Sequence, residues 1–454
     1  MAEPGVSGTM LSPKDCSHSP QTRFDLVQVN GAWTRQTEQG QGAEGKLSHA
    51  KIYEKKSEHG VSWTVISPIV FTYRVIQCQN LLDPRNDTLL WGHLGGEERK
   101  EAAGKSKPVK RFIVIDEVVD RLYGSQVLGY FESRDVLCKI LPLPTTEENK
   151  SMELVTRILE EVHEFGLDRR SEPIIAIGGG VCLDVVGLAA SLYRRRTPYI
   201  RVPTTVLAYV DASVGAKTGV NFAGGKNKLG SYVPPAATFL DRSFFQTLPM
   251  RQISNGMAEM LKMALMKHPG LFQLLEAEGR RLLDTKLQPD STDSSGHEDS
   301  AAASTRIAIE TMLEELAPNL WEDDLDRLVD FGHLVSPELE MRVLPALLHG
   351  EAVNIDMSFM VYVAHQRGLL TAEEKQRIIR CMLGLELPVW HQDCTLALIH
   401  KSLQERLRHS AGSLRIPLPT GLGQAEIFHD MIEENVLSQA YERWTNELAP
   451  SGTC

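Results

Sequence analysis

The chain has 454 residues, enough for two or three domains with a sizeable hydrophobic core. Hydrophobic residues make up 42% and charged residues 24%, the ordinary composition of a globular protein. A formal net charge of -11 argues against a nucleic-acid partner, although a basic cluster such as Arg194-Arg195-Arg196 still suits a single anion.

The cysteines and the first residues of the chain indicate a reducing compartment. The seven cysteines are an odd number without a CxxC pair, which is typical of reduced thiols in a cytoplasmic protein. The N-terminal residues lack the basic stretch and apolar core of a secretory signal. No run of about 18 apolar residues occurs, so we expect no membrane span.

The first half of the chain predicts an α/β domain. Residues 1–22 are polar and rich in Ser, Pro and Gly, which predicts a disordered tail. Between residues 23–245, short apolar runs alternate with stretches of helical periodicity, and strands are expected at 111–116, 138–143 and 173–177. Such alternation is typical of a parallel sheet covered by helices.

The second half, residues 246–454, predicts an all-α domain. Residues 288–304 interrupt it with a low-complexity run that we expect to be a mobile insert. Helical periodicity appears at 250–267, 269–284, 304–316, 337–348, 350–367 and 371–384.

A glycine-rich turn follows the apolar strand at 174–177. Gly178-Gly179-Gly180 leads into a helix with Asp184 near its start. Glycines let a backbone approach a pyrophosphate, and the N–H groups of a helix start can bind it. Leu183 stands where the usual dinucleotide fingerprint has its third glycine, so the motif alone is as typical of a tight turn as of a cofactor site. Asp184 suits a nicotinamide amide or a ribose, or simply the helix terminus.

Two hydroxyl side chains, Thr204 and Thr205, follow the predicted strand at 199–202. The carboxyl end of a parallel strand is where α/β folds bind ligands. Taken alone, however, two threonines at this place are more typical of ordinary turn capping.

The segment from Asp211 to Asn227 gathers charged and amide groups in a glycine-rich stretch. It contains Asp211, Lys217, Lys226 and Asn227 within DASVGAKTGVNFAGGKN. Two lysine cations, together with the metal ligands described below, suit a phosphate group and neighbouring hydroxyls. We therefore expect a phosphorylated, hydroxyl-rich substrate.

Three residues form a sufficient ligand set for a divalent metal. Glu259 shares a predicted helix face with Asn255 and Lys262, while His333 and His349 lie further along the chain. A solvated Glu–Lys pair and two structural histidines are the plainer interpretation of each feature alone. One carboxylate and two imidazoles with open positions would nonetheless suit a catalytic Zn²⁺.

Taken together, these segments resemble the sugar phosphate cyclases, the superfamily of 3-dehydroquinate synthase. The similarity runs from about Arg111 to about Gly423 and follows the family's order and spacing. This ordered set is far more specific than any one motif. The motifs that carry it are IGGGVCLDVVGLAASLYRRRTPYIRVPTT, VDASVGAKTGVNFAGGKNKLG, TLPMRQISNGMAEMLK, DFGH and HGEAV.

The resemblance implies a dehydroquinate synthase-like fold, a homodimer, and a role for each matching residue. The implied NAD contacts are Asp116, Glu147, Lys150, Gly179, Gly180, Asp184, Thr204 and Thr205. The implied ligands of Zn²⁺ or Co²⁺ are Glu259, His333 and His349. The implied substrate and phosphate contacts are Arg195, Asp211, Lys217, Lys226, Asn227 and Lys262.

Four positions depart from the pattern of dehydroquinate synthases. That enzyme has lysine, arginine, asparagine and a second histidine where this chain has Met312, Asp326, Asp330 and Pro337, respectively. Glu322 keeps an acidic position of the family's active site. Lysine and arginine suit a substrate carboxylate, whereas methionine cannot bind one and aspartate repels it. We therefore expect a substrate without that carboxylate, whose hydroxyls bind Asp326 and Asp330.

This pattern resembles the members of the superfamily that close sedoheptulose 7-phosphate into a cyclitol, with a close match to their animal form. The implied reaction is redox-neutral. It comprises transient oxidation by NAD⁺, elimination of phosphate, reduction, ring opening and aldol closure.

Other functions remain open on the sequence. Dehydroquinate synthase itself is disfavoured by Met312 and Asp326, whereas desmethyl-4-deoxygadusol synthase uses the same sugar and fits as well. A metal-dependent polyol dehydrogenase typically has aspartate where Glu259 stands. A non-catalytic NAD-binding protein would be expected to have lost part of the metal and lysine set.

Overall fold

The computed structural model describes residues 26–29, 32–35, 51–57, 60–66, 71–103, 108–289, 299–409 and 414–450. The chain forms two compact units, one that ends at Phe71 and one that begins at Thr72. The predicted tail at 1–22 lies outside the described residues. Two antiparallel hairpins belong to the first unit, β1 (Leu26–Val29) with β2 (Ala32–Arg35) and β3 (Lys51–Ser57) with β4 (Gly60–Ile66).

The second unit is built around a six-stranded parallel sheet. Its inner strands are nearly continuous apolar runs, as expected when helices cover both faces of a sheet. In spatial order the strands are β5 (Arg74–Cys78), β12 (Ala237–Asp241), β9 (Tyr199–Pro203), β8 (Ile174–Gly178), β6 (Lys110–Asp116) and β7 (Leu137–Leu143).

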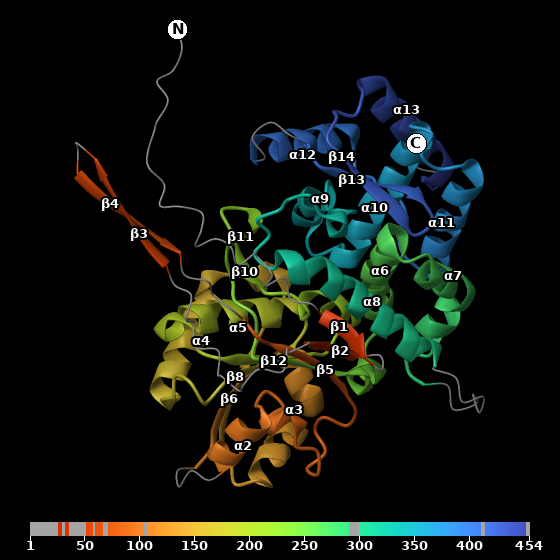
Figure 1. Ribbon diagram of the computed structural model, residues 1–454. Coiled ribbons are helices and arrows are strands. Elements are labelled where there is room, and N and C mark those ends of the chain that lie inside the picture. The colour runs from red at the N-terminus through yellow and green to blue at the C-terminus, as the bar shows by residue number, and fades with distance from the viewer. Residues whose placement is uncertain are drawn as a thin grey trace. The chain divides into compact units, whose positions relative to one another are not determined.

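Helices pack on both faces of this sheet (Figure 1). Side chains alternate along each strand, so Phe112 and Val114 of β6 join one apolar cluster, and Ile113 and Ile115 join the other. The predicted α/β half with a parallel sheet is therefore confirmed. The first cluster is covered by α4 (Met152–Phe165) and α5 (Gly180–Leu192), the second by α1 (Thr88–Trp91) and α3 (Glu117–Glu132); α2 (Gly96–Ala103) precedes β6.

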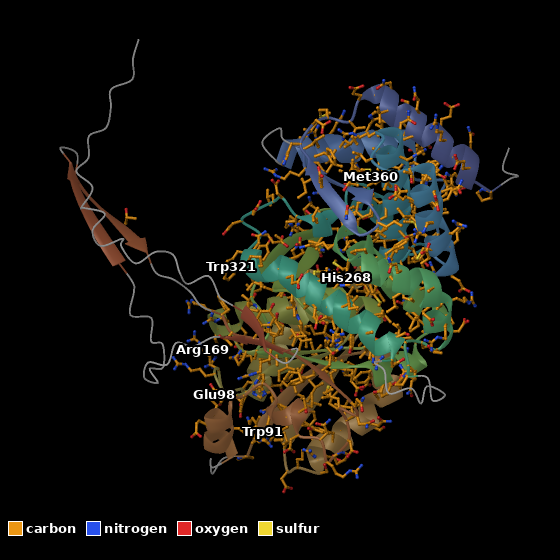
Figure 2. The ribbon with its side chains drawn as sticks, turned by 45° about the vertical axis from the view of Figure 1, so that its right-hand side comes forward. Trp91, Glu98, Arg169, His268, Trp321 and Met360 are labelled. Carbon is orange, nitrogen blue, oxygen red and sulfur yellow. The ribbon has the colours of Figure 1, made fainter. Side chains whose placement is uncertain are left out.

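From residue 250 onward, the described part of the unit is mainly helical, as expected, with one added two-stranded hairpin. Figure 2 shows Met360 among these helices and Trp91 at the opposite end, beside the sheet. The elements are α6 (Met250–Lys267), α7 (Pro269–Asp284), α8 (Ser300–Leu316), α9 (Ser336–Val343), α10 (His349–Gln366), α11 (Ala372–Gly384), α12 (Leu396–His409), β13 (Ile416–Gly421), β14 (Gln424–Phe428) and α13 (Glu434–Leu448).

The expected mobile insert at 288–304 is too long at its C-terminal end. Residues from Ser300 onward belong to α8, and Ala301 and Ser304 are fully buried. The helix begins there because the side chain of Asp299 caps it by accepting a hydrogen bond from the backbone N–H of Ala301. Residues 290–298 lie outside the described ranges.

Two further expectations can be compared with the described part of the chain. Its cysteines, Cys78, Cys138, Cys182, Cys381 and Cys394, are all free thiols. No helix in the described ranges has both the length and the apolar character required to cross a bilayer. The division into domains at 245 and 246 stays a prediction.

Candidate active site

A cleft of about 1140 Å³ opens where the α/β half meets the helical half. Asp116 at the end of β6, Gly179 after β8 and Thr204 after β9 line one side of it. His333 and His349 line the other side. Carboxyl ends of parallel strands meet at one edge of a sheet, which is why segments far apart in sequence share this wall.

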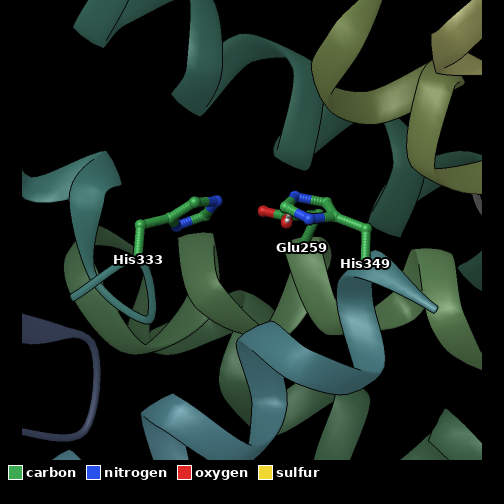
Figure 3. Close-up of side chains that lie close together, drawn as sticks. All are labelled: Glu259, His333 and His349. Carbon is green, nitrogen blue, oxygen red and sulfur yellow. Dashed lines mark ion pairs between the residues drawn. The ribbon is translucent and has the colours of Figure 1, made fainter. Parts of the chain in front are cut away.

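Glu259, His333 and His349 gather at one point in the cleft. One potential ligand atom from each lies within 4.8 Å of those of the other two. Figure 3 shows both imidazole rings pointing toward the space beside the Glu259 carboxylate. Both carboxylate oxygens of Glu259 are buried without a hydrogen bond of good geometry, although Lys262 Nζ forms an ion pair with Oε2 at 2.5 Å. Because a buried carboxylate needs compensation, this set fits a divalent metal.

The start of α10 brings His349 to Glu259 on α6. The backbone at Gly350 lies so close to α6 that a Cβ there would sit 1.9 Å from the carbonyl oxygen of Asn255. The side chain of Asn255 also accepts hydrogen bonds from the backbone N–H groups of Gly350, at 2.7 Å, and Glu351, at 3.3 Å. This close contact and cap fix the first residue of α10 beside the carboxylate.

A tight loop positions His333. Gly332 has a positive φ of 74°, which favours glycine, and a Cβ there would crowd Met357 and Val353. The buried carboxylate of Asp356 accepts hydrogen bonds from the backbone N–H groups of the next turn. His333 Nδ1 lies 3.1 Å from the carbonyl oxygen of Phe331, which leaves Nε2 for a ligand.

The charges around the triad favour metal-binding protonation states. Burial lowers the pKa of His333 well below its ordinary value, and the positive Lys262 adds to this effect. The imidazole is therefore neutral at neutral pH, the form that coordinates a metal. Burial raises the pKa of Glu259, whereas Lys262 opposes that rise. Burial alone would also raise the pKa of Asp211, but Lys262 lowers it overall, so Asp211 is ionised.

The predicted lysines extend from a two-stranded antiparallel ribbon into the same cleft. Lys217 begins β10 (Lys217–Phe222) and forms an ion pair with Glu322. Lys226 belongs to β11 (Gly225–Tyr232) and donates hydrogen bonds to Glu340, at 2.6 Å to Oε1. The ribbon therefore presents two cations to the cleft, and Lys226 Nζ lies 3.0 Å from His349 Nδ1.

A buried lysine organises the predicted cofactor side. Lys150 Nζ donates hydrogen bonds to Asp184, at 2.7 Å, and to the side-chain oxygen of Asn227, at 2.6 Å. Gly179 and Gly180 begin α5 without a side-chain cap, so backbone N–H groups of the helix start are available to an anion.

Most of the predicted site residues line this cleft, and Glu259 lies buried beside it. The lining residues are Asp116, Glu147, Lys150, Gly179, Gly180, Asp184, Thr204, Thr205, Asp211, Lys217, Lys226, Asn227, Lys262, Met312, Glu322, Asp330, Pro337, His333 and His349.

Two predicted residues are not part of the cleft lining. Arg195 lies on the exposed turn η3 (Tyr193–Arg195) after α5. Asp326 pairs instead with Arg415, at 2.9 Å, and with His429, at 3.4 Å. The expectation that Asp326 binds substrate hydroxyls is therefore corrected, because its carboxylate is engaged outside the cleft.

Two contributors to the site, Arg327 and Glu340, were not predicted from the sequence. Arg327, next to Asp326, forms ion pairs with Glu322 and Asp330, so the carboxylates of both cleft residues are already paired with its guanidinium group. Glu340 is buried and contacts both His349 and Lys226. Burial alone would raise the pKa of Glu340, but His349 and Lys226 lower it overall. Neither residue stands in a local motif, so no sequence signal distinguished it from a surface charge.

The fold and the site define a class of α/β proteins with a cleft at the carboxyl ends of a parallel sheet and a ligand set that fits a divalent metal. The comparisons identify the family within this class. Residues 140–255 match the family model "3-dehydroquinate synthase N-terminal", and residues 256–408 match "3-dehydroquinate synthase C-terminal". The chain belongs to the 3-dehydroquinate synthase family.

Three relatives characterise its place in that family. A 2-epi-5-epi-valiolone synthase of Streptomyces albus is 45% identical over 82% of this chain and 88% of its own. A demethyl-4-deoxygadusol synthase of Trichormus variabilis is 37% identical over 71% of this chain and 78% of its own. The solved 2-epi-5-epi-valiolone synthase of Streptomyces hygroscopicus subsp. jinggangensis, with NAD⁺ and Zn²⁺ bound, has a TM-score of 0.76 and 41% identity, and the match covers 85% of this chain and 100% of that one.

Proposed function

We propose that the protein is a sugar phosphate cyclase of the 2-epi-5-epi-valiolone synthase type. It converts sedoheptulose 7-phosphate into 2-epi-5-epi-valiolone and phosphate. The observation that carries the proposal is one cleft that combines a metal-ligand triad, two lysines and an apolar Met312 in its wall. The 45% identity to a 2-epi-5-epi-valiolone synthase supports it.

The residues of the cleft suit NAD and Zn²⁺, or Co²⁺ in its place. Glu259, His333 and His349 would hold the metal, and the glycines at the start of α5 would hold the pyrophosphate of NAD. The solved relative has NAD⁺ and Zn²⁺ bound, which supports the choice of these two cofactors. When bound, NAD supplies reversible hydride transfer, and the metal polarises a substrate oxygen.

The side chains of this protein would position the sugar phosphate and stabilise its charge. Lys217, Lys226 and Asn227 would bind the phosphate and stabilise the negative charge that grows as it leaves. Lys262 holds Asp211, with 3.2 Å between Nζ and Oδ2, beside the metal ligands. Asp211 is thereby ionised and suited to accept a hydrogen bond from a substrate hydroxyl.

The substrate head that fits this cleft is a neutral polyol. Met312 offers no charge to a carboxylate, and the guanidinium of Arg327 is already paired with Glu322 and Asp330. A substrate carboxylate would have to displace one of these acids and would be repelled by the other. Specificity against a carboxylated sugar therefore rests on Met312, Glu322, Arg327 and Asp330, in place of the Asp326 expected from the sequence.

Identification of the reaction product also distinguishes the proposed activity from those of related enzymes. The activity of the demethyl-4-deoxygadusol synthase relative, which is 37% identical, is the second candidate.

The homodimer, the cytoplasmic location and the animal form stay proposals that rest on the family resemblance, and the relatives compared above come from bacteria. Gel filtration with light scattering would test the dimer.

The decisive experiment is incubation of the purified protein with sedoheptulose 7-phosphate and NAD⁺. We expect stoichiometric release of phosphate with no net NADH, and NMR and mass spectra of 2-epi-5-epi-valiolone. Steady accumulation of NADH would indicate a polyol dehydrogenase instead. Release of phosphate with demethyl-4-deoxygadusol as product would replace the proposed activity with the second candidate.

A further inference from the structure

We propose that Glu340 is a positioning residue that joins the metal ligand His349 to the phosphate contact Lys226. This inference rests on the proposed function and assigns a role within the same site. Glu340 lies on α9 and is only 2% exposed. Its Oε2 lies 2.8 Å from His349 Nδ1, and its Oε1 lies 2.6 Å from Lys226 Nζ. One carboxylate therefore contacts both functional groups.

The first task of Glu340 is to choose the tautomer of His349. Nδ1 of His349 lies close to two groups, Glu340 Oε2 and Lys226 Nζ, the latter at 3.0 Å. An ammonium can only donate hydrogen bonds, and a carboxylate can only accept them. If Nδ1 accepted from Lys226, the ring proton would sit on Nε2, which lies 3.5 Å from Glu259 Oε1. His349 could then not coordinate a metal through Nε2.

With Glu340 as acceptor, the ring proton stays on Nδ1 and the Nε2 lone pair points into the triad. A metal-bound histidine commonly donates its other ring N–H to a carboxylate, which orients the ring and makes it a better ligand. His333 uses the carbonyl oxygen of Phe331 for this purpose. The two histidines therefore have different supports, one neutral and one charged.

The second task of Glu340 is to hold Lys226 at the wall of the cleft. Lys226 comes from β11 of the α/β half, whereas Glu340 and His349 come from the helical half. Both oxygens of Glu340 accept hydrogen bonds from Lys226 Nζ, at 2.6 and 2.5 Å. Because the same carboxylate supports the metal ligand, loss of its charge should disturb the metal site and the lysine together.

The test measures metal binding without any turnover. We expect Glu340→Gln to weaken Zn²⁺ binding about 10–100-fold in a competition titration with a chromophoric chelator. The matched control is Glu338→Gln on the same helix, because the Glu338 side chain is 36% exposed and pairs with Lys401. His349→Ala is measured in parallel, since it removes a proposed ligand outright.

These variants separate the inference from the proposed function. If His349→Ala weakens Zn²⁺ binding but Glu340→Gln matches the Glu338→Gln control, the role of Glu340 is refuted and the metal triad stands. If His349→Ala also leaves Zn²⁺ binding unchanged, the triad fails and the inference fails with it. Weakened binding in Glu340→Gln and His349→Ala, with an unchanged control, supports both.

A measurement on the unmutated protein keeps the inference testable if Glu340→Gln does not fold. Nitrogen-15 NMR of the histidine rings distinguishes a protonated Nδ1 from a protonated Nε2. We expect His349 to carry its proton on Nδ1 in the metal-free and the metal-loaded protein. A proton on Nε2 of His349 and none on Nδ1 in the metal-free protein would overturn the role of Glu340.

Discussion

The side-chain oxygen of Asn255 on α6 accepts a hydrogen bond of 2.7 Å from the backbone N–H of Gly350 on α10. This bond joins the helix that carries Glu259 to the residue after His349. A methyl group at position 350 would meet the carbonyl oxygen of Asn255 at 1.9 Å. Backbone atoms cannot yield as a flexible side chain can, so the two helices would have to separate.

We therefore expect Gly350→Ala to lower the free energy of unfolding by about 1–3 kcal/mol or more, the usual cost of overpacking. It should also weaken Zn²⁺ binding, because His349 moves with the start of α10. Urea denaturation and a metal titration would measure the two effects. Gly384→Ala is a suitable control, since a Cβ at Gly384 meets no atom within 4 Å. Unchanged metal affinity in Gly350→Ala would contradict the argument.

The exposed lysine of the cleft can be tested without disturbing the fold. The Lys217 side chain is 55% exposed, so Lys217→Ala should change the free energy of unfolding by less than about 0.5 kcal/mol. Turnover should fall about 100- to 1,000-fold, because a charge that stabilises the departing phosphate is lost. Lys401→Ala is the control, with a side chain that is 59% exposed and lies outside the cleft lining. Near-normal turnover in Lys217→Ala would remove this lysine from the site.

Metal removal tests the triad in the whole enzyme. Dialysis against a chelator should abolish phosphate release, and added Zn²⁺ or Co²⁺ should restore it. A ligand present at about 1,000 times its dissociation constant stabilises the folded state by about 4 kcal/mol, so the metal-free protein should also unfold at a lower temperature. Activity that is indifferent to chelation would refute the metal assignment of Glu259, His333 and His349.

The buried carboxyl group of Asp356, behind the loop that carries His333, should make the free energy of unfolding depend on pH. Burial raises the pKa of Asp356 to about 6. An acid with a higher pKa in the folded state binds its proton more tightly there, so its contribution to stability falls as the pH rises from about 4 to about 6. The loss is roughly 3 kcal/mol for a shift of about two units.

Asp356→Asn should remove this dependence while it keeps one oxygen for the backbone N–H groups of Val335 and Ser336. Between about pH 4 and about pH 7, the free energy of unfolding of the variant should rise by roughly 3 kcal/mol relative to that of the unmutated protein. Urea unfolding at both pH values measures this difference. An equal difference at the two values would show that Asp356 titrates as it does in the unfolded chain.

The sequence by itself determined the local elements and the chemistry of the site. Apolar runs at 111–116 and 138–143 predicted β6 and β7, and periodicity at 250–267 predicted α6 to the residue. These patterns are local consequences of burying one face or both faces of an element, so they can be read without tertiary information. The metal triad and the two lysines were also named from the sequence, with the help of the family resemblance.

The tertiary structure alone decided which neighbouring side chains share the cleft. Arg327 has an extended backbone, with φ -126° and ψ 121°, and consecutive side chains in extended backbone point to opposite sides. Asp326 therefore turns toward Arg415, while Arg327 meets Glu322 and Asp330. The role of Glu340 likewise depends on the tertiary contact of α9, α10 and β11, because Lys226 is remote in sequence, His349 begins the next helix, and the sequence of α9 gives no sign of either contact.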